Sequence, residues 1–362
     1  MRILRDYVLN EFWGPFLGCL GVMTIVMVLG NLIKLANMVI NRGVNIIIIG
    51  KLFMYLLPFL LSYTIPISML LAALICLGRL SSDNEIIAIQ ASGINTFRII
   101  LPLIIISFIL SLFLLILNDR IIPKVHYASR KTVEEIGLKS PAAALEPGTF
   151  IDAFQGNIIF IYRIEGNKLY DIRIYQPEEG KPTRTIIAKQ GEFIALPERK
   201  AIKLKLVDGS TDEPDPENPK NFYKLTFKQY FMTMDLAKVS QKLEKKLKDM
   251  TVKELKKEVV KYQAKKVDVN PLYTEIHRKL ALSFAPLAFI LIGAPLAMVT
   301  KRRQVSINFG LGFFIIMIYY LLVLAFQALS VEAKITPVLG MWITNIIFIS
   351  TGSYLIYKQC VS

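Results

Sequence analysis

The chain has 362 residues, of which 54% are hydrophobic and 20% are charged, and its mean hydropathy is +0.48. A soluble globular chain is usually about 45–50% apolar with about 25% charge. Because the excess of apolar residues lies in long blocks, the composition excludes a disordered or collagen-like chain and argues against a purely soluble enzyme. The formal charge of +15 suits anionic lipid headgroups or nucleic acid. All three cysteines lie in or beside apolar blocks, which argues against a disulfide framework or a Cys-based zinc site.

Six blocks are apolar and long enough to span a bilayer, which takes about 20 residues. They are Phe12–Ile33, Ile46–Leu77, Ile99–Leu117, Leu280–Val299, Ile307–Leu329 and Pro337–Tyr357. Pro58 and Pro66 are expected to bend the second block. The blocks form two groups of three with about 160 residues between them. We therefore predict an α-helical polytopic membrane protein with six transmembrane helices, arranged 3+3 around an inserted domain.

The distribution of Lys and Arg predicts the orientation of these spans. With the N-terminus inside, the inside segments carry Arg2, Arg5, Arg79, Arg98, Lys301, Arg302, Arg303 and Lys358. The short outside loops carry Lys34, Arg42, Lys51 and Lys334. Eight inside against four outside favours cytoplasmic N- and C-termini and places the insert on the opposite side. The first outside loop is itself basic, against this trend.

The insert has the alternation of β-strands from Phe150 to Asp235. Apolar and polar residues alternate in 170–175, 202–206 and 223–228, which is typical of half-buried antiparallel strands. Turn signals lie at 165–167, 177–180 and 208–209, and Asp212–Pro219 reads as an acidic, proline-rich surface loop. We expect seven or eight strands in an all-β sandwich or jelly-roll-like domain. The other interpretation is a small extracytoplasmic domain of unassigned purpose.

A basic segment, Lys238–Lys266, follows the strands with 11 Lys against four acidic residues. Thr251 and Glu254 have capping-box spacing, so a helix is expected to start there. The segment is either a solvated helical face or a basic collar near anionic headgroups. Because it lacks interleaved aromatic residues and is expected outside the cytoplasm, no nucleic-acid partner is predicted.

Familiar catalytic motifs are absent from the sequence. It contains no G-x-x-x-x-G-K-[ST] and no G-x-S-x-G, so binding of ATP by a P-loop is excluded. The two histidines, His126 and His277, form no H-E-x-x-H pattern and are interpreted as membrane-boundary or loop residues. We therefore expect no catalytic residue, cofactor or metal on this chain, and a role in transport, tethering or sensing.

The loop between the second and third spans, Gly78–Gly93, has the pattern of a short amphipathic helix. Ser81 or Ser82 can cap it, acidic residues occupy its first turn, and Gly93 is a natural stop. A cytoplasmic helix of this kind is what a permease of an ATP-binding-cassette (ABC) transporter uses to dock its ATPase. An ordinary interfacial turn is the other interpretation. The candidate coupling residues are Arg79, Asp83, Glu85, Ile86 and Ile89.

The residues of this loop resemble the coupling-helix motif of the LptF/LptG family, the permease subunits of the lipopolysaccharide exporter. Glu275–Pro286 followed by Gly293–Leu296 resembles the start of that family's fourth span, and Leu145–Phe150 resembles the start of its periplasmic jelly roll. The acidic pair Asp83/Glu85 favours the LptF type. Phe59 departs from the lysine that LptG-type chains can carry early in the second span. The resemblance covers nearly the whole chain.

The resemblance implies a multi-pass protein of the bacterial inner membrane with three parts. Residues 1–122 hold the first three spans and the coupling helix 81–93, residues 123–270 the periplasmic jelly roll and the basic connector 238–266, and residues 271–362 the last three spans. The implied partners are lipopolysaccharide, a dimeric cytoplasmic ABC ATPase that carries ATP and Mg²⁺, a second LptF/LptG-type permease subunit, and periplasmic jelly-roll bridge proteins.

The resemblance implies that the basic residues of the first outside loop contact the substrate. Lys34, Arg42 and Lys51 are expected to meet the phosphates of lipid A at the outer headgroup level. Snorkelling to any phospholipid phosphate is the simpler reading. The alternative function is a mechanotransmission or sensor subunit of the ABC type whose β-domain binds a periplasmic partner. Only an exporter needs an apolar, lipid-sized space between the first and fifth spans.

Overall fold

The computed structural model describes residues 2–40, 44–139, 147–154, 157–165, 168–178, 181–196, 201–214, 222–235, 245–299 and 305–361. The chain divides into two compact units. The helical unit comprises Met1–Gly30, Leu56–His126 and Lys246–Ser362. The sheet unit comprises Asn31–Tyr55 and Tyr127–Lys245.

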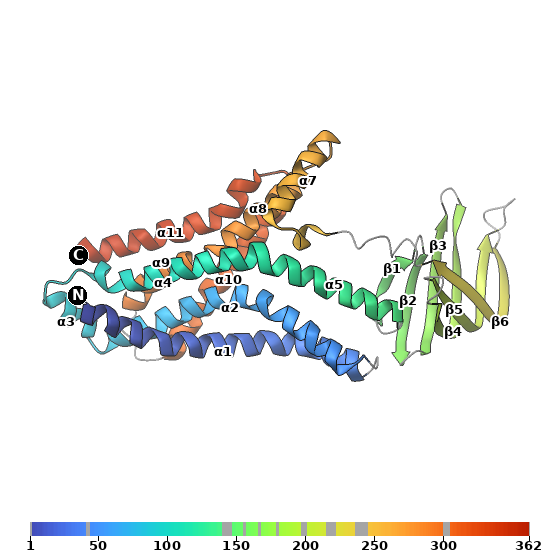
Figure 1. The fold of residues 1–362 in the computed structure, drawn as a ribbon, viewed down its shortest axis with the longest axis horizontal. Helices are drawn as coiled ribbons and strands as arrows, with labels where there is room; N and C mark the ends of the chain where they lie inside the picture. The colour runs from blue at the N-terminus through green and yellow to red at the C-terminus, as the bar shows by residue number, and fades with distance from the viewer. Residues whose placement is uncertain are drawn as a thin grey trace. The chain divides into compact units, whose positions relative to one another are not determined.

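The first part of the fold is a set of helices, several of them long (Figure 1). In the first half of the chain they are α1 (Arg2–Ile40), α2 (Ile46–Ser82), α3 (Glu85–Ala91), α4 (Thr96–Ile116), the π-helix η1 (Leu117–Ile121) and α5 (Ile122–Lys139). In the second half they are η3 (Leu247–Asp249), α7 (Val252–Ala264), α8 (Asn270–Ser283), α9 (Ala285–Val299), α10 (Val305–Val331) and α11 (Pro337–Val361). At 1.5 Å per residue, the 39 residues of α1 measure about 58 Å, roughly twice the ~30 Å hydrocarbon core.

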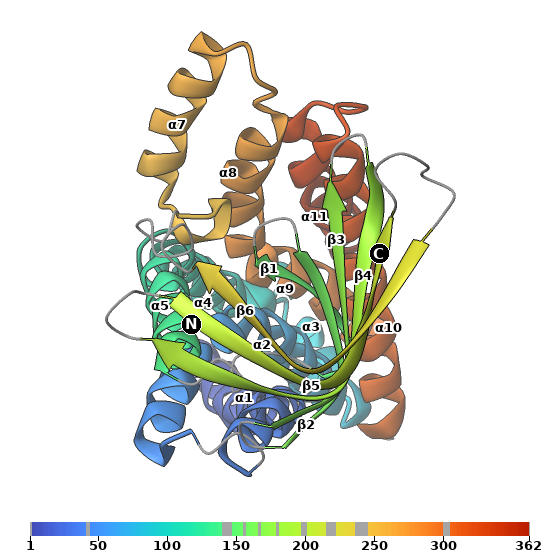
Figure 2. The same ribbon diagram turned by 90° about the vertical axis from the view of Figure 1, so that its right-hand side faces the viewer.

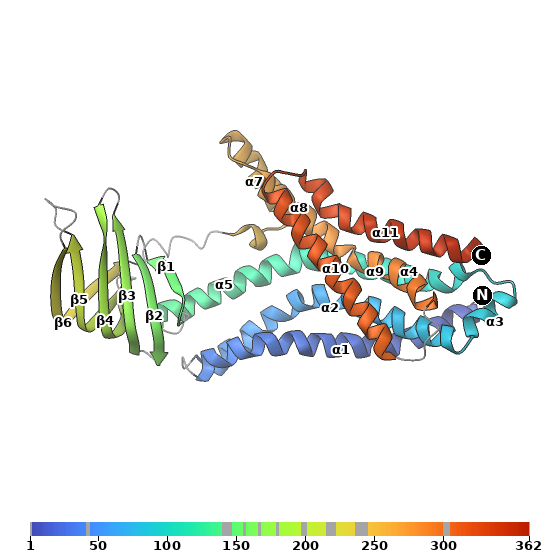
Figure 3. The ribbon, with the colours of Figure 1, turned by 180° about the vertical axis from the view of Figure 1, so that it is seen from behind.

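Among the described residues, five helices are long and apolar enough to cross a membrane, and a bent pair makes a sixth span. The pair is α8 and α9, which meet at an angle of 43°. The prediction of a polytopic helical membrane protein is thereby confirmed. The start of α1, α3 and the end of α11 all lie at one end of the helical unit (Figures 1 and 3), as expected if both termini and the loop at 78–93 share one side.

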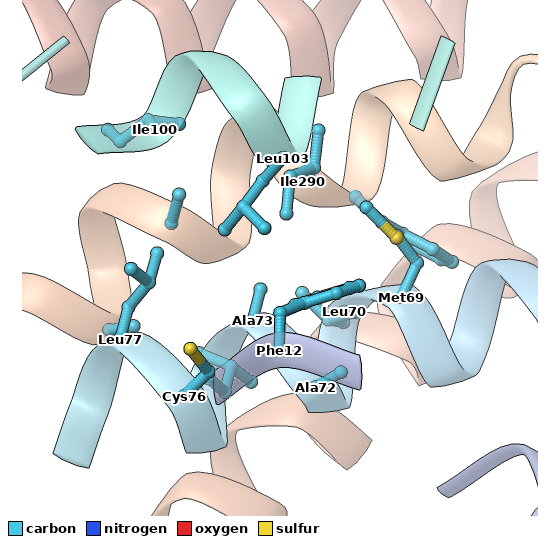
Figure 4. Close-up of a cluster of buried hydrophobic side chains, with 14 of the residues drawn as sticks. Phe12, Met69, Leu70, Ala72, Ala73, Cys76, Leu77, Ile100, Leu103 and Ile290 are labelled. Atoms are coloured by element: carbon cyan, nitrogen blue, oxygen red, sulfur yellow. The ribbon is translucent and has the colours of Figure 1, made fainter. Parts of the chain in front are cut away.

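α2 is the central helix of the helical unit. In its most apolar stretch 83% of the residues are buried, against 11% for α1 and 17% for α10. Met69, Leu70 and Leu77 of α2 pack with Phe12 of α1 and Leu103 of α4 (Figure 4). Two glycines allow neighbouring helices to approach α2 closely, because a Cβ on Gly293 or Gly312 would lie 2.6 Å from a leucine side chain of α2. α1 and α10 therefore keep broad apolar faces exposed in the single chain, and α10 crosses the unit obliquely (Figure 3).

The insert forms one antiparallel sheet whose six described strands are paired in chain order. The strands are β1 (Phe150–Phe154), β2 (Asn157–Glu165), β3 (Lys168–Glu178), β4 (Lys181–Leu196), β5 (Ala201–Pro214) and β6 (Phe222–Asp235). The predicted turns at 166–167 and 179–180 lie outside the described residues, as do 215–219 of the acidic loop and 238–244 of the basic segment. An inserted all-β domain is confirmed, with six strands in the described part where seven or eight were expected.

The count differs because β5 continues through the turn predicted at Asp208–Gly209, and that prediction is wrong. The pairing register is the same on both sides of Asp208, which adopts a left-handed φ of 52°. Asp171 of β3 also adopts a left-handed backbone conformation, with φ 51°. In β3, Leu169 and Ile172 are both buried, although strict alternation would place them on opposite faces. The strands of the sheet are strongly curved (Figure 2), and the left-handed residues lie within them without a change of pairing register.

The sheet unit has its own apolar core. Ile159, Leu169, Ile172, Ile186 and Phe193 form one cluster, and each is at most 1% exposed. Leu204 is also fully buried, whereas Arg173, next to Ile172, is exposed.

Candidate functional site

The candidate coupling element comprises the end of α2 and α3, residues 78–93. α3 is a seven-residue helix, Glu85–Ala91, preceded by Asn84 with φ 58° and followed by Gly93 with φ 80°. The prediction that Gly93 ends the helix is confirmed, since glycine tolerates a left-handed backbone.

The predicted cap at Ser81 or Ser82, and with it a helix beginning at 81, is wrong. α2 extends to Ser82, and the hydroxyls of Ser81 and Ser82 donate hydrogen bonds to backbone carbonyls of α9 and α2. Ser81 Oγ donates to the carbonyl of Met298 at 2.8 Å, and Ser82 Oγ donates to the carbonyl of Gly78 at 2.8 Å. The first of these bonds fastens the end of α2 to α9.

The apolar stripe of α3 faces the helical unit. Ile86 is 4% exposed, and Ile89 packs against the main apolar core. Asp83 and Ile87 are exposed. Ile86 and Ile89 therefore hold α3 in place, and the surface that α3 offers to a partner is formed by its exposed residues.

Glu85 and Arg79 of the element have partners on α1 that the sequence did not reveal. The hydroxyl of Tyr7 donates to Oε2 of Glu85 at 2.6 Å, and Nη2 of Arg79 lies 2.5 Å from Oε2 of Glu11. The structure thus brings Arg79 and Glu85 together at one end of α1. The sequence offered one signal for these contacts: Tyr7 and Glu11 are four residues apart, so they lie on one side of α1, next to the buried Phe12.

Of the three candidate substrate cations, Lys34 lies on α1, which continues to Ile40, but its side chain lies outside the described residues, as does Arg42 entirely. Lys51 is exposed on α2, and its ammonium lies 5.9 Å from the centre of the Tyr55 ring.

A buried charged pair on α8 also escaped the sequence reading. Glu275 and Arg278 form two hydrogen bonds of 2.7 and 2.8 Å, and their side chains are 8% and 18% exposed. Because a largely buried guanidinium needs a partner, Glu275 satisfies Arg278 within α8.

The connector after the sheet is fastened by polar contacts to η1 and α5. Asp119 in the π-helix accepts a hydrogen bond from the backbone N–H of Val252 at 2.6 Å. Asp249 is buried and lies 2.5 Å from Nδ1 of His126. The capping box predicted at Thr251 and Glu254 is confirmed and starts α7. His126 therefore has a structural contact, with Asp249 of the connector. Among the described residues no group of three His, Cys, Asp or Glu side chains could hold a metal ion.

Comparison with known proteins agrees with this architecture. Residues 6–358 match the family described as lipopolysaccharide export system permease LptF/LptG. The chain is 20% identical over 358 residues to the lipopolysaccharide export system permease protein LptF of Escherichia coli (strain K12), covering 97% of this chain and 93% of that protein, and the same values hold for LptF of Shigella flexneri. It is 23% identical over 152 residues, 42% of each chain, to the uncharacterized protein RP871 of Rickettsia prowazekii (strain Madrid E).

The match runs through both groups of spans and the inserted sheet, so it confirms the resemblance seen at 78–93 and 275–296. The chain belongs to the LptF/LptG family of lipopolysaccharide export system permeases.

Proposed function

We propose that this chain is an LptF-type subunit that pairs with a second permease subunit and a dimeric cytoplasmic ATPase, and that it extracts lipopolysaccharide for transfer to a periplasmic bridge. The role as a non-catalytic permease subunit of a lipopolysaccharide-exporting ABC transporter follows from the family. The similarity to LptF of E. coli along almost the whole chain supports the LptF type.

The uneven burial of the spans is the observation that carries the proposal. An exporter of a lipid with several acyl chains needs an apolar space that a single six-helix chain cannot enclose alone. α1 and α10, the first and fifth spans, are the least buried of the candidate spanning helices, at 11% and 17%. Their exposed faces are the surfaces that a second permease subunit and the acyl chains would cover.

The orientation proposed from the Lys/Arg distribution assigns each part of the chain to one side of the inner membrane. It places α3 and both ends of the chain in the cytoplasm and the sheet unit in the periplasm, with the three parts divided at residues 122 and 270. α5 extends the third span as helix to Lys139, so the periplasmic part begins with helix and not with strands. ATP and Mg²⁺ bind the partner ATPase, which docks on the coupling element around Arg79, Asp83 and Glu85.

The substrate-contact role of the outer cations is supported by their position. Lys34 lies on α1 and Lys51 on α2, on either side of the connection between these two helices. Lys51 is exposed and its stem lies beside Tyr55, an arrangement that keeps an ammonium available to an anionic group at a membrane surface. Lipid A phosphates are the anions that we propose for Lys34, Arg42 and Lys51.

The proposal is tested by co-expressing this chain with the ATPase and second permease encoded in the same organism and purifying the complex through a tag on this chain. We expect the ATPase and lipopolysaccharide to co-purify, and ATP hydrolysis to respond to added lipopolysaccharide. Recovery of the ATPase without lipopolysaccharide, and with hydrolysis indifferent to it, would favour a mechanotransmission subunit instead.

A further inference from the structure

Two polar side chains one turn apart tie the first helix to the coupling element. Tyr7 donates its hydroxyl hydrogen to Glu85 at 2.6 Å, and Glu11 pairs with Arg79 at 2.5 Å. Residues four apart on a helix share one face, so both ties lie on the side of α1 that meets the end of α2 and α3.

The same face of α1 is packed at this end and loosens further along. Val8 and Phe12 are fully buried, and Phe12 lies among side chains of α2 and α4 (Figure 4). Phe12 stacks on Phe16 with ring centroids 5.6 Å apart. Beyond this point, the apolar side chains of α1 that are more than half exposed are Leu17, Val22, Ile25, Val26, Leu29 and Ile33. α1 is therefore anchored most firmly where it meets the coupling element.

The hydrogen bond from Tyr7 leaves the Glu85 carboxylate able to bind a second group. Tyr7 contacts Oε2, and among the described residues Oε1 of Glu85 accepts no hydrogen bond. A carboxylate accepts several hydrogen bonds, so a basic side chain of the ATPase can bind Oε1 while Tyr7 stays in place. Glu85 can then contact the ATPase and α1 at the same time.

We propose that Tyr7 and Glu11 are positioning residues that carry the ATPase-driven movement of the coupling element into α1, a wall of the lipid-binding space. A hydrogen bond is lost once its donor and acceptor separate beyond about 3.5 Å, so α1 must follow a displaced coupling element or lose the Tyr7–Glu85 hydrogen bond and weaken the Glu11–Arg79 ion pair. The inference rests on the proposed function, because it assumes an ATPase that moves α3.

The test uses the full complex in nanodiscs and exchanges the charges of the Glu11–Arg79 ion pair. Glu11→Arg and Arg79→Glu are made separately and together, and the outward movement of α1 is reported by a fluorophore on Val26→Cys. Cys360→Ser removes the partly exposed native thiol, whereas Cys19 and Cys76 are buried. Because each single exchange places like charges opposite each other, we expect each to reduce the ATP-dependent fluorescence change about threefold to tenfold, and the double exchange to restore most of it.

Tyr7→Phe provides a second measurement that removes one hydroxyl and keeps the ring. We expect it to lower the ATP-dependent fluorescence change by a similar factor. Asp6→Asn is the matched control, because Asp6 is an exposed residue of α1 that pairs with neighbouring Arg5, and it should behave as wild type.

Wild-type fluorescence changes in Tyr7→Phe and in both single exchanges would overturn the inference. So would an assembled double exchange that responds no better than the single ones. These outcomes differ from failure of the proposed function, in which the unmodified complex itself neither binds lipopolysaccharide nor couples it to ATP hydrolysis.

Discussion

Removing the negative charge of the buried pair on α8 should destabilise the helical unit far more than removing the same charge from an exposed pair. Glu275 and Arg278 are three residues apart and 8% and 18% exposed, whereas Glu258 and Lys261 on α7 have the same spacing but are 26% and 66% exposed. Glu275→Gln leaves the buried guanidinium of Arg278 without its counter-charge. Breaking a buried ion pair in this way costs about 3–5 kcal/mol, while an exposed pair contributes about 0–1 kcal/mol.

The assay is the midpoint of thermal unfolding of the purified chain in detergent. At about 2–4 °C per kcal/mol for a domain of this size, Glu275→Gln should lower the midpoint by roughly 6–12 °C or more, and Glu258→Gln by less than about 4 °C. The double variant Glu275→Gln/Arg278→Gln should recover part of the loss, because the unpaired guanidinium of Arg278 is then absent. Equal effects of Glu275→Gln and Glu258→Gln, or a strictly additive double variant, would refute the reasoning from burial.

Three further predictions concern lipid and partner contacts. Lys34→Ala should reduce lipopolysaccharide binding, and Lys34→Arg should keep much of it, in titrations at two salt concentrations; equal affinity of Lys34→Ala and wild type at low salt, where screening is weakest, would leave Lys34 as an interfacial anchor. Glu85→Ala should leave the fold intact but weaken association with the ATPase, measured as ATPase recovered per permease after purification; undiminished recovery together with normal transport would show that Glu85 is dispensable. Photo-crosslinkers at inward Ile172 should trap lipopolysaccharide when ATP is present, and crosslinks confined to outward Arg173 would show that the sheet is no lipid conduit.

The spans and the ends of local elements were predictable because they depend on neighbouring residues. The apolar blocks, the left-handed stop at Gly93 and the capping box at Thr251 are all written in short stretches of sequence. The turn predicted at Asp208–Gly209 failed because the cross-strand pairing of β5 with β4 and β6 outweighs the local turn preference of these two residues.

Contacts between distant residues could not be read from one sequence. Tyr7 and Glu85 are 78 positions apart, and only the packing of α1 beside α3 brings them together. The buried pair on α8 was hidden for another reason, since Glu275 and Arg278 look like ordinary surface residues in the sequence and only the packed helical unit buries them. The Ser81 cap was plausible locally, but α2 did not end where the cap required.

ATP-driven transfer of lipopolysaccharide tests the central claim most directly. The chain, its ATPase and second permease are reconstituted in liposomes that contain lipopolysaccharide, and a purified periplasmic bridge protein carrying a photo-crosslinker is added outside. The account predicts that lipopolysaccharide becomes crosslinked to the bridge protein only when ATP is supplied and this chain is present. Equal crosslinking without ATP, or with liposomes that lack this chain, would contradict its assignment as a subunit that exports lipopolysaccharide.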